Sequence, residues 1–417
     1  INNFKKYDNQ FLDSLDSINN LTNQLIKKTT ELYDDLKFNY EEIYSNLDFN
    51  RYDINISNDN LILNEFNFES ILLDIDVLLN NLDLLTSNAK NKVFNAKNNF
   101  QLGLIITKLT EVRNILKNLI DNKSNYIKWL SLYRSNLNNQ ISLYTSDMDI
   151  KNFISNKIIK YFPSFFLCSA TLTIADSFEF FLNNLGINNN FNYSINTTIR
   201  KSPFYYDDQS RMYIYNQKRD INSNEYLDDV SNQITSLNNA LNKKILVLCT
   251  SYKQVKLISQ YLIANKIDST NIFAQTSKFS KQAILEGYKK SKKGILIGTA
   301  TFWEGIDLAG DLLEILFIIR VPFSNPSNPY NQNLSNMIQA SGGNPFYDLE
   351  LPNAILKMKQ GIGRLIRTDK DTGVCFITDP RLCNSRYGKF IVDEIASSPK
   401  IYKNINEIIN KIDNFLG

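Results

Sequence analysis

The feature that most constrains the fold is a series of short, continuously apolar segments that alternate with amphipathic helices from about residue 200 onward. The strand-like segments are ILVL, NIFA, GILIG, EILFII and GVCFI, and helical segments such as KQVKLISQYLIA and KQAILEGYK separate them. Strands that are apolar on both faces are typical of a parallel sheet covered by helices on both sides. The sequence therefore predicts an α/β fold whose functional groups lie in the loops after the strands, at 250–252, 299–310, 320–323 and 379–381.

The first 125 residues are predicted to be helical instead. They contain no Pro and a single Gly, Gly103, and apolar residues recur at helical spacing in stretches such as FLDSLDSINNLTNQLI. We expect long amphipathic helices over 8–48, 66–86, 88–100 and 101–121, with an irregular break near 50–62. This pattern predicts a helical bundle or a coiled-coil-like insertion.

Between these regions the chain changes character. The segments NYIKWLSLY and NQISLYTS are predicted strands, DIKNFISNKII is a predicted helix, and the apolar run FPSFFLC leads into SATLT at 169–173. Residues 1–150 carry 15 Lys and Arg against 20 Asp and Glu, a balance of −5, whereas the remainder has a balance of +8. The basic second part is compatible with nucleic acid or nucleotide phosphate as a partner.

Composition excludes several kinds of site. The chain has no His, so a His general base, a Ser-His-Asp triad and a His-ligated metal are all excluded. Cys168, Cys249, Cys375 and Cys383 form no CxxC pair, and we expect no metal site in this chain. The first three lie in apolar, strand-like runs and are expected to be buried thiols in a reducing compartment. No apolar run reaches the length of about 18 residues needed for a membrane span, which predicts a soluble, cytoplasmic protein with no membrane contact.

Two segments combine charged residues with glycine. The first is the loop GTATFWEGIDLAGD, 298–311, which follows the strand ILIG and holds Trp303, Glu304, Gly305 and Asp307. Two carboxylates at a buried strand end can hydrogen-bond a ribose, a backbone amide or a neighbouring Arg. A solvated acidic turn is the alternative for this loop.

The second segment is QGIGRLIRT, 360–368. On a helix, Gln360, Arg364 and Arg367 stand at i, i+4 and i+7 and share one face, so their donors can converge on a phosphate. A Gly inside a helix costs about 1 kcal/mol relative to Ala. Gly361 and Gly363 therefore indicate that another backbone or a nucleotide approaches closely. An exposed basic face with surface ion pairs is the alternative for this segment alone.

Four motifs follow one another along the chain: SATLT at 169–173, VLCTSY at 247–252, TATFWEGIDLAGD at 299–311 and QGIGRLIRTDKDTGVCFITDPR at 360–381. Together they resemble the C-terminal motor half of superfamily 2 helicases of the DinG/XPD type, over about 125–417. The resemblance implies ATP hydrolysis between two RecA-like domains, coupled to 5′→3′ movement on single-stranded DNA in repair or replication.

The resemblance also implies a role for each matching residue. Catalytic roles at the triphosphate fall to Arg364, Arg367 and Gln360 of motif VI. Nucleotide contacts fall to Glu304, Gly305, Asp307 and Gly363. Contacts with the nucleic acid, or coupling between it and the nucleotide, fall to Ser169, Ala170, Thr171, Thr250, Ser251, Tyr252, Thr301 and Trp303.

Three parts are implied in the same way. Residues 1–125 are expected to form a helical arch-like insertion, and 126–194 the C-terminal remnant of a first RecA-like domain that includes motif III. Residues 195–417 are expected to form the second RecA-like domain with motifs IV to VI.

The P-loop pattern, GxxxxGK followed by Ser or Thr, and a DEAH-type box occur nowhere in this chain. ATP and Mg²⁺ would then be held mainly by a first RecA-like domain outside the chain. That domain is the expected partner, and the protein is otherwise expected to be a monomer. The chain is expected to begin, at Ile1, just after motif II. Where members of the family have an iron–sulfur cluster, its cysteines lie upstream of motif II. Whether such a cluster precedes this chain is left open. The alternative function is that of a non-catalytic nucleic-acid-binding remnant or interaction protein.

Overall fold

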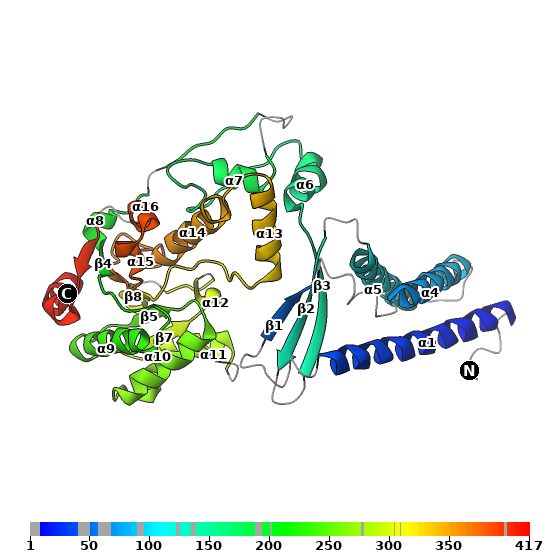
Figure 1. The fold of residues 1–417 in the computed structure, drawn as a ribbon, viewed down its shortest axis with the longest axis horizontal. Coiled ribbons are helices and arrows are strands. Elements are labelled where there is room, and N and C mark those ends of the chain that lie inside the picture. Colours follow the sequence, from blue (N-terminus) through cyan, green and yellow to red (C-terminus); the bar gives the residue numbers. More distant parts are fainter. Residues whose placement is uncertain are drawn as a thin grey trace. The chain divides into compact units, whose positions relative to one another are not determined.

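The computed structural model describes residues 9–40, 51–56, 68–89, 96–121, 126–134, 139–187, 194–200, 202–276, 279–303, 305–308, 310–395 and 398–417. The chain divides into two compact units (Figure 1). The first consists of Ile1–Ile150 with Asn325–Gly342, and the second of Lys151–Ser324 with Gly343–Gly417. Each unit has its own hydrophobic core.

A seven-stranded sheet forms the centre of the second unit, in the order β10-β4-β9-β8-β5-β7-β6. All six pairings between these strands are parallel, which confirms the predicted α/β fold. The strands are β4 (Ser210–Tyr215), β5 (Ile245–Leu248), β6 (Ile272–Ala274), β7 (Ile295–Gly298), β8 (Ile315–Ile318), β9 (Gly373–Ile377) and β10 (Lys400–Tyr402).

Side chains of the central strands alternate between two cores. In β5, Ile245 and Val247 belong to one apolar cluster, whereas Leu246 and Leu248 belong to the other. This alternation explains why every position of the strand is apolar. Figure 1 shows α9 (Asn224–Ala240) and α10 (Tyr252–Ala264) on one side of the strands and α14 (Leu351–Ile362) and α16 (Arg386–Ile395) on the other. Helices outside the first unit's core are α6 (Ile150–Phe153), α7 (Glu179–Asn184), α8 (Tyr206–Gln209), α9 (Asn224–Ala240), α10 (Tyr252–Ala264), α11 (Lys281–Lys290), α12 (Ala300–Trp303), α14 (Leu351–Ile362), α15 (Arg381–Asn384), α16 (Arg386–Ile395) and α17 (Ile409–Leu416).

The first unit contains a three-stranded antiparallel sheet, β1-β2-β3. Its strands are β1 (Arg51–Asn55), β2 (Tyr126–Arg134) and β3 (Asn139–Asp147), and its helices are α1 (Asn9–Asn39), α4 (Phe68–Ala89), α5 (Ala96–Ile120) and α13 (Pro329–Ala340). Ile75, Leu119 and Leu130 lie in its core. Although α13 comes from far along the chain, it packs against β1 and β2.

The predicted helices of this unit differ from the observed ones in extent. The helix predicted over 8–48 ends at Asn39, and residues 41–50 lie outside the described residues. The helices predicted over 88–100 and 101–121 are joined in α5, which passes through Gly103 without interruption. The predicted break near 50–62 holds β1, whose partner β2 lies more than seventy residues later. Local periodicity could not reveal that pairing. The assignment of these parts to an arch and to a remnant of a RecA-like domain stays a prediction.

The apolar run before SATLT is exposed. Residues 162–170 form neither helix nor strand, and Phe166 is 87% exposed. Cys168 is exposed too, so its predicted burial is wrong. An apolar strand is buried only when neighbouring strands pair with it, and none of the described residues does so here. Cys249 and Cys375 are buried in the sheet as predicted, and burial raises the pKa of both thiols.

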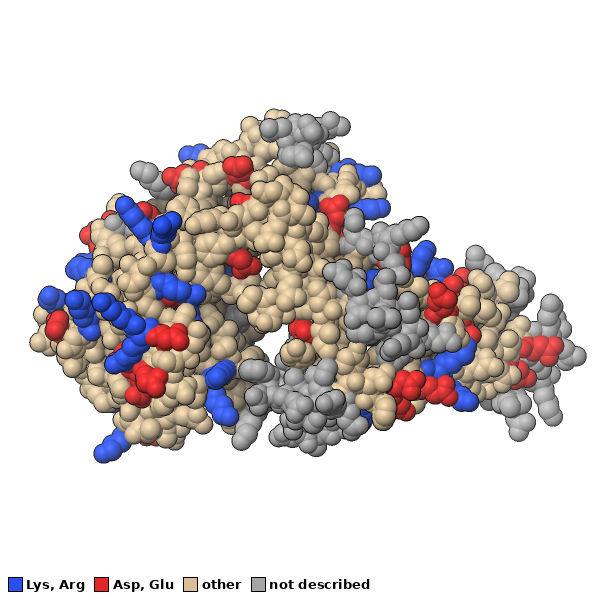
Figure 2. Space-filling model, viewed as in Figure 1, with Lys and Arg blue, Asp and Glu red and all other residues tan. Residues whose placement is uncertain are grey.

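Charge is mixed on the face of the second unit that Figure 2 draws. On the face drawn in Figure 2, its described Lys and Arg side chains are interspersed with Asp and Glu. A nucleic-acid site on this unit therefore has to be sought in local clusters. Among the described residues, no helix combines the length and apolar composition of a membrane crossing, and no group of three or more His, Cys, Asp or Glu could hold a metal ion.

Candidate functional site

The loop that follows β7 packs against the end of α14. Trp303 is buried, and its indole nitrogen donates a hydrogen bond to the Cys249 carbonyl oxygen at 3.2 Å. A Cβ placed on Gly361 would lie 2.8 Å from two carbons of the Trp303 ring. The close approach predicted at Gly361 is therefore made by a side chain, not by a backbone or a nucleotide. At Gly363 a Cβ would meet only the carbonyl oxygens of residues 359 and 360, so the approach of a nucleotide there stays a prediction.

Both arginines of the segment 360–368 bind the backbone of this loop. Arg364 donates from Nε to the Trp303 carbonyl oxygen and from Nη1 to the Ile306 carbonyl oxygen, each at 2.7 Å. Arg367 donates from Nη2 to the same Ile306 oxygen at 3.1 Å, and its Nη1 lies 3.2 Å from a carboxylate oxygen of Asp307. The two segments that were separate candidates in the sequence thus form one cluster.

The ion pair between Arg367 and Asp307 lies at the surface. The Arg367 side chain is 33% exposed and that of Asp307 is 82% exposed. Exposed ion pairs contribute at most about 1 kcal/mol, so Arg367 can exchange this carboxylate for a phosphate at little cost. Its Nε is buried and has no hydrogen-bond partner in the described part of the chain, which leaves one donor unused.

The helix predicted through residues 360–368 ends early. α14 stops at Ile362, and Gly363 is its C-terminal cap. Gln360 is therefore helical, but Arg364 and Arg367 lie in the turn beyond it, so the prediction that the three side chains share a helix face is wrong. The arginines reach the loop through this turn.

Asp371 holds that turn. Its Oδ2 accepts hydrogen bonds from the amides of Arg367 and Thr368, at 2.8 and 2.9 Å. Burial acts to raise the pKa of Asp371, but the hydrogen bonds from the Thr368 hydroxyl and the backbone amides outweigh it, and the pKa is lowered from 3.8. The resulting stabilisation is present above pH 3.8 and is lost as the pH falls through the lowered pKa.

The segment 169–173 contacts α14 through a hydrogen bond of Gln360. The Gln360 Nε2 donates to the Thr171 hydroxyl at 3.3 Å. Ser169 accepts a hydrogen bond from the Thr171 amide at 3.2 Å, and both Ser169 and Ala170 are exposed. The structure therefore brings Thr171 to the cluster and leaves Ser169 and Ala170 at the surface.

Lys359 of α14 binds both the segment that contains Thr173 and helix α16. Its Nζ donates to the Thr173 carbonyl oxygen at 3.2 Å and pairs with Glu394 of α16 at 2.6 Å. Glu394 also accepts a hydrogen bond from the Ala175 amide at 3.0 Å. Residues 171–175 are thus attached to α14 and α16.

Gln275, which the sequence analysis missed, links three residues at the carboxyl edge of the sheet. Its Nε2 donates to the Tyr252 and Thr301 hydroxyls, both at 3.0 Å, and its Oε1 accepts from the Thr299 amide at 2.7 Å. Tyr252 remains 61% exposed. The signal for Gln275 was present, because it is the polar residue directly after the strand NIFA.

Lys281 was also missed. Its Nζ donates to the carbonyl oxygens of Thr301 at 2.6 Å and Gly305 at 3.4 Å. Gly305 has a φ of +67°, a left-handed conformation that favours glycine. The predicted residue Glu304 lies outside the described residues.

Ser251 caps the N-terminus of α10, and Thr250 directly precedes it. The Ser251 hydroxyl accepts from the Gln254 amide at 3.3 Å, and the Thr250 amide donates to the Gln254 Oε1 at 2.8 Å. Both residues are exposed. Their contact with a nucleic acid stays a prediction.

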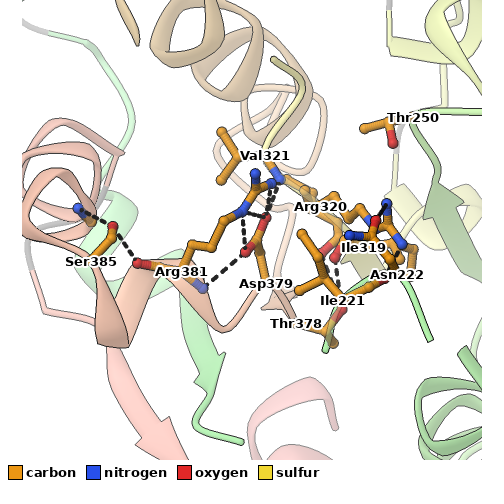
Figure 3. Close-up of polar contacts among 12 residues, drawn as sticks. Ile221, Asn222, Thr250, Ile319, Arg320, Val321, Thr378, Asp379, Arg381 and Ser385 are labelled. Carbon is orange, nitrogen blue, oxygen red and sulfur yellow. Dashed lines mark hydrogen bonds and ion pairs between the residues drawn. The ribbon is translucent and has the colours of Figure 1, made fainter. Parts of the chain in front are cut away.

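A buried carboxylate ties the loops after β8 and β9 together (Figure 3). Asp379 is 0% exposed and accepts hydrogen bonds from the amides of Val321 and Arg381, at 2.8 and 2.9 Å. It also binds the Arg381 guanidinium through Nε and Nη2, the latter at 2.6 Å. Arg320 beside it donates to the Ile221 carbonyl oxygen and to the Asn222 side chain, and burial lowers the pKa of Arg320.

The contact between Gly361 and Trp303 can be tested by substitution. Gly361→Ala is expected to lower the free energy of unfolding by about 1–3 kcal/mol, because the added methyl overlaps the indole ring. Gly103 in α5 is the matched control, since a Cβ there has nothing within 4 Å. Gly103→Ala should stabilise the protein by up to about 1 kcal/mol. Urea unfolding measures both, and the same gain in both variants would contradict the contact.

Comparisons with known proteins relate this chain to helicases. The family model described as "Helicase C-terminal domain" matches residues 234–398. The chain is 30% identical over 275 residues to the 3'-5' exonuclease DinG of Bacillus subtilis, covering 65% of this chain and 29% of that protein. It is 28% identical over 313 residues to the ATP-dependent DNA helicase YoaA of Haemophilus influenzae, covering 75% of this chain and 47% of that protein. A solved structure titled XPD helicase aligns with a TM-score of 0.49 at 18% identity, over 79% of this chain and 55% of that one.

The family model and the curated relatives define the class: residues 234–398 are a helicase C-terminal domain. Together with the similarity to DinG and YoaA, this match indicates the C-terminal region of a DinG-type helicase. It spans less than half the length of either curated relative.

Proposed function

We propose that this chain supplies the second RecA-like domain of an ATP-dependent DNA helicase, in which ATP hydrolysis drives movement along single-stranded DNA. The observation that carries the proposal is the attachment of Arg364 and Arg367 to the loop 303–307. Arg364 holds the loop through two backbone carbonyls, whereas Arg367 presents a partly exposed guanidinium that binds one backbone carbonyl and a surface carboxylate. Such a guanidinium suits the oxygens of a phosphoryl group, where charge develops during transfer.

Other parts of the nucleotide site are proposed to come from a first RecA-like domain. The P-loop pattern is absent from this sequence, and the described residues contain no acidic cluster able to hold Mg²⁺. ATP and Mg²⁺ would therefore be bound mainly by that domain, with Arg367 completing the site. The exposed apolar segment 162–168 supports this proposal, because its side chains would be covered if it joined the sheet of that domain.

The missing P-loop favours a second candidate, a non-catalytic nucleic-acid-binding protein. Against it stands the cluster of Trp303, Gly361, Arg364 and Arg367, in which a buried ring and a glycine fit each other. Nucleic-acid binding alone does not require that cluster.

Hydrolysis assays separate the two candidates. This chain alone should bind single-stranded DNA, with affinity that falls as salt rises, and should hydrolyse no ATP. A longer polypeptide that adds a P-loop domain before Ile1 should hydrolyse ATP, faster with single-stranded DNA. Its strand-displacement polarity, proposed to be 5′→3′, is measured on substrates with a single 5′ or 3′ overhang.

Two results would contradict the proposal. Turnover by this chain alone that Arg367→Ala abolishes would show that no second domain is needed. No turnover by the longer polypeptide, despite an intact P-loop and bound DNA, would favour the non-catalytic candidate.

A further inference from the structure

An open pocket lies at the carboxyl ends of β4 and β9. It is lined by residues other than Arg364 and Arg367. Its volume is about 310 Å³, near the lower end of the range for small-ligand pockets. The polar and charged residues that bear on its chemistry are Gln217, Lys218, Arg219, Arg381, Asn384 and Ser385. All belong to the second unit.

Gln217 lines this pocket and carries an unsatisfied donor. Its side chain is only 9% exposed, and its Oε1 accepts a hydrogen bond from the Arg219 amide. Its Nε2 is buried without a hydrogen-bond partner in the described part of the chain. Buried donors without a partner are rare and unfavourable, so one that lines an open pocket indicates a ligand with an acceptor oxygen.

Arg381 contributes a fixed cation. The buried Asp379 carboxylate binds its Nε and Nη2 (Figure 3). The Phe323 ring lies 5.1 Å from its guanidinium carbon. Its Nη1 makes no hydrogen bond within the described residues. Burial acts to lower the pKa of Arg381, but its bond to Asp379 outweighs burial and raises the pKa. Arg381 is therefore charged at every physiological pH.

The net charge around the pocket is small. Arg381 is paired with Asp379, and Arg219 is paired with Asp229 at 2.9 Å. Lys218 is exposed and makes no ion pair within the described residues, and Asp220 lines the same pocket. A ligand with a single negative charge matches these groups better than a nucleoside di- or triphosphate does.

We propose that this pocket binds one backbone phosphate of a single-stranded nucleic acid, with the Gln217 amide and Lys218 as its donors. This inference rests on the proposed function and assigns a contact to residues outside the helicase motifs. The sheet order places the pocket on the same edge as Tyr252 and Thr301: the loops after β4, β9, β8, β5 and β7 follow one another along it. At about 4.8 Å between strands, this row is roughly 19 Å long, enough for several nucleotides. The strand would run from the Gln275 cluster to the Gln217 pocket.

Binding of a fluorescein-labelled oligothymidylate to this chain, measured by anisotropy at several salt concentrations, tests the proposal. Gln217→Glu keeps the acceptor for the Arg219 amide but replaces the free donor by a negative charge. It should weaken binding by at least about tenfold. Lys218→Ala should weaken binding and reduce the slope of log K against log[salt] by about 0.7. Lys292→Ala is the matched control, because Lys292 is exposed just before β7, at the opposite edge of the sheet.

The outcomes distinguish this inference from the proposed function. If the wild-type chain binds the oligonucleotide and Gln217→Glu binds it equally tightly, the inference about the pocket is overturned and the helicase proposal stands. Failure of the wild-type chain to bind any oligothymidylate would overturn both. Displacement of the oligonucleotide by excess ADP in the wild type but not in Gln217→Glu would make the pocket a nucleotide site and overturn the inference. Thermal melting of each variant confirms that it is folded.

Discussion

Replacing Arg367 by alanine is expected to slow ATP hydrolysis by at least about 100-fold in a polypeptide that joins this chain to a P-loop domain. The reason is the loss of a cation where negative charge develops on the transferred phosphoryl group. Arg367 is suited to that task, since its buried Nε is unused and its Nη1 is paired only with the exposed Asp307. Phosphate release at saturating ATP and single-stranded DNA measures kcat.

Arg364→Ala is the informative comparison. Arg364 makes two 2.7 Å hydrogen bonds to loop carbonyls, so its loss should lower both kcat and the melting temperature. Arg367→Ala should lower kcat while leaving the melting temperature and DNA affinity nearly unchanged. An Arg367→Ala protein that keeps most of its hydrolysis rate would exclude Arg367 from the phosphate site.

Asp379→Asn is expected to lower the free energy of unfolding by about 3–5 kcal/mol. Asp379 is fully buried and accepts bonds from the Val321 amide and from the backbone and guanidinium of Arg381. An amide there removes the charge that compensates Arg381 and turns one acceptor into a donor facing other donors. Urea unfolding followed by fluorescence measures the loss.

Two variants control for this effect. Asp307→Asn removes a carboxylate that is 82% exposed and pairs with Arg367, and it should cost less than about 1 kcal/mol. Asp379→Leu combined with Arg381→Met removes both charges but leaves the Val321 amide without its acceptor, so it should recover only part of the loss. A loss in Asp379→Asn no larger than in Asp307→Asn would contradict the structural role of the buried pair.

The sequence analysis predicted the sheet well and the site in part. The strands ILVL, ILIG and GVCFI are found where they were predicted, because apolarity at every position is a property of contiguous residues. It also recognised that Gly361 needed a close neighbour. It could not identify Trp303 as that neighbour, since the two residues meet only when α14 packs on the loop after β7.

Errors arose where a local pattern met a tertiary constraint. Helical spacing continued through Arg364 and Arg367, but Gly363 ends α14 and Asp371 binds the following amides. Cys168 lies in a strand-like run, yet no strand of the described residues pairs with it. Gln275 carried too weak a signal, because a single polar residue after a strand is common.

The sequence by itself determined the parallel α/β sheet and the loops in which functional groups lie, because strand period and apolarity are encoded in neighbouring residues. Only the tertiary structure decided that Arg364 and Arg367 bind the loop 303–307, that Gln275 links Tyr252 to Thr301, and that Gln217 keeps a free donor in a pocket beside Arg381. These contacts join residues far apart in the chain, and their geometry is set by the packing of whole helices and strands.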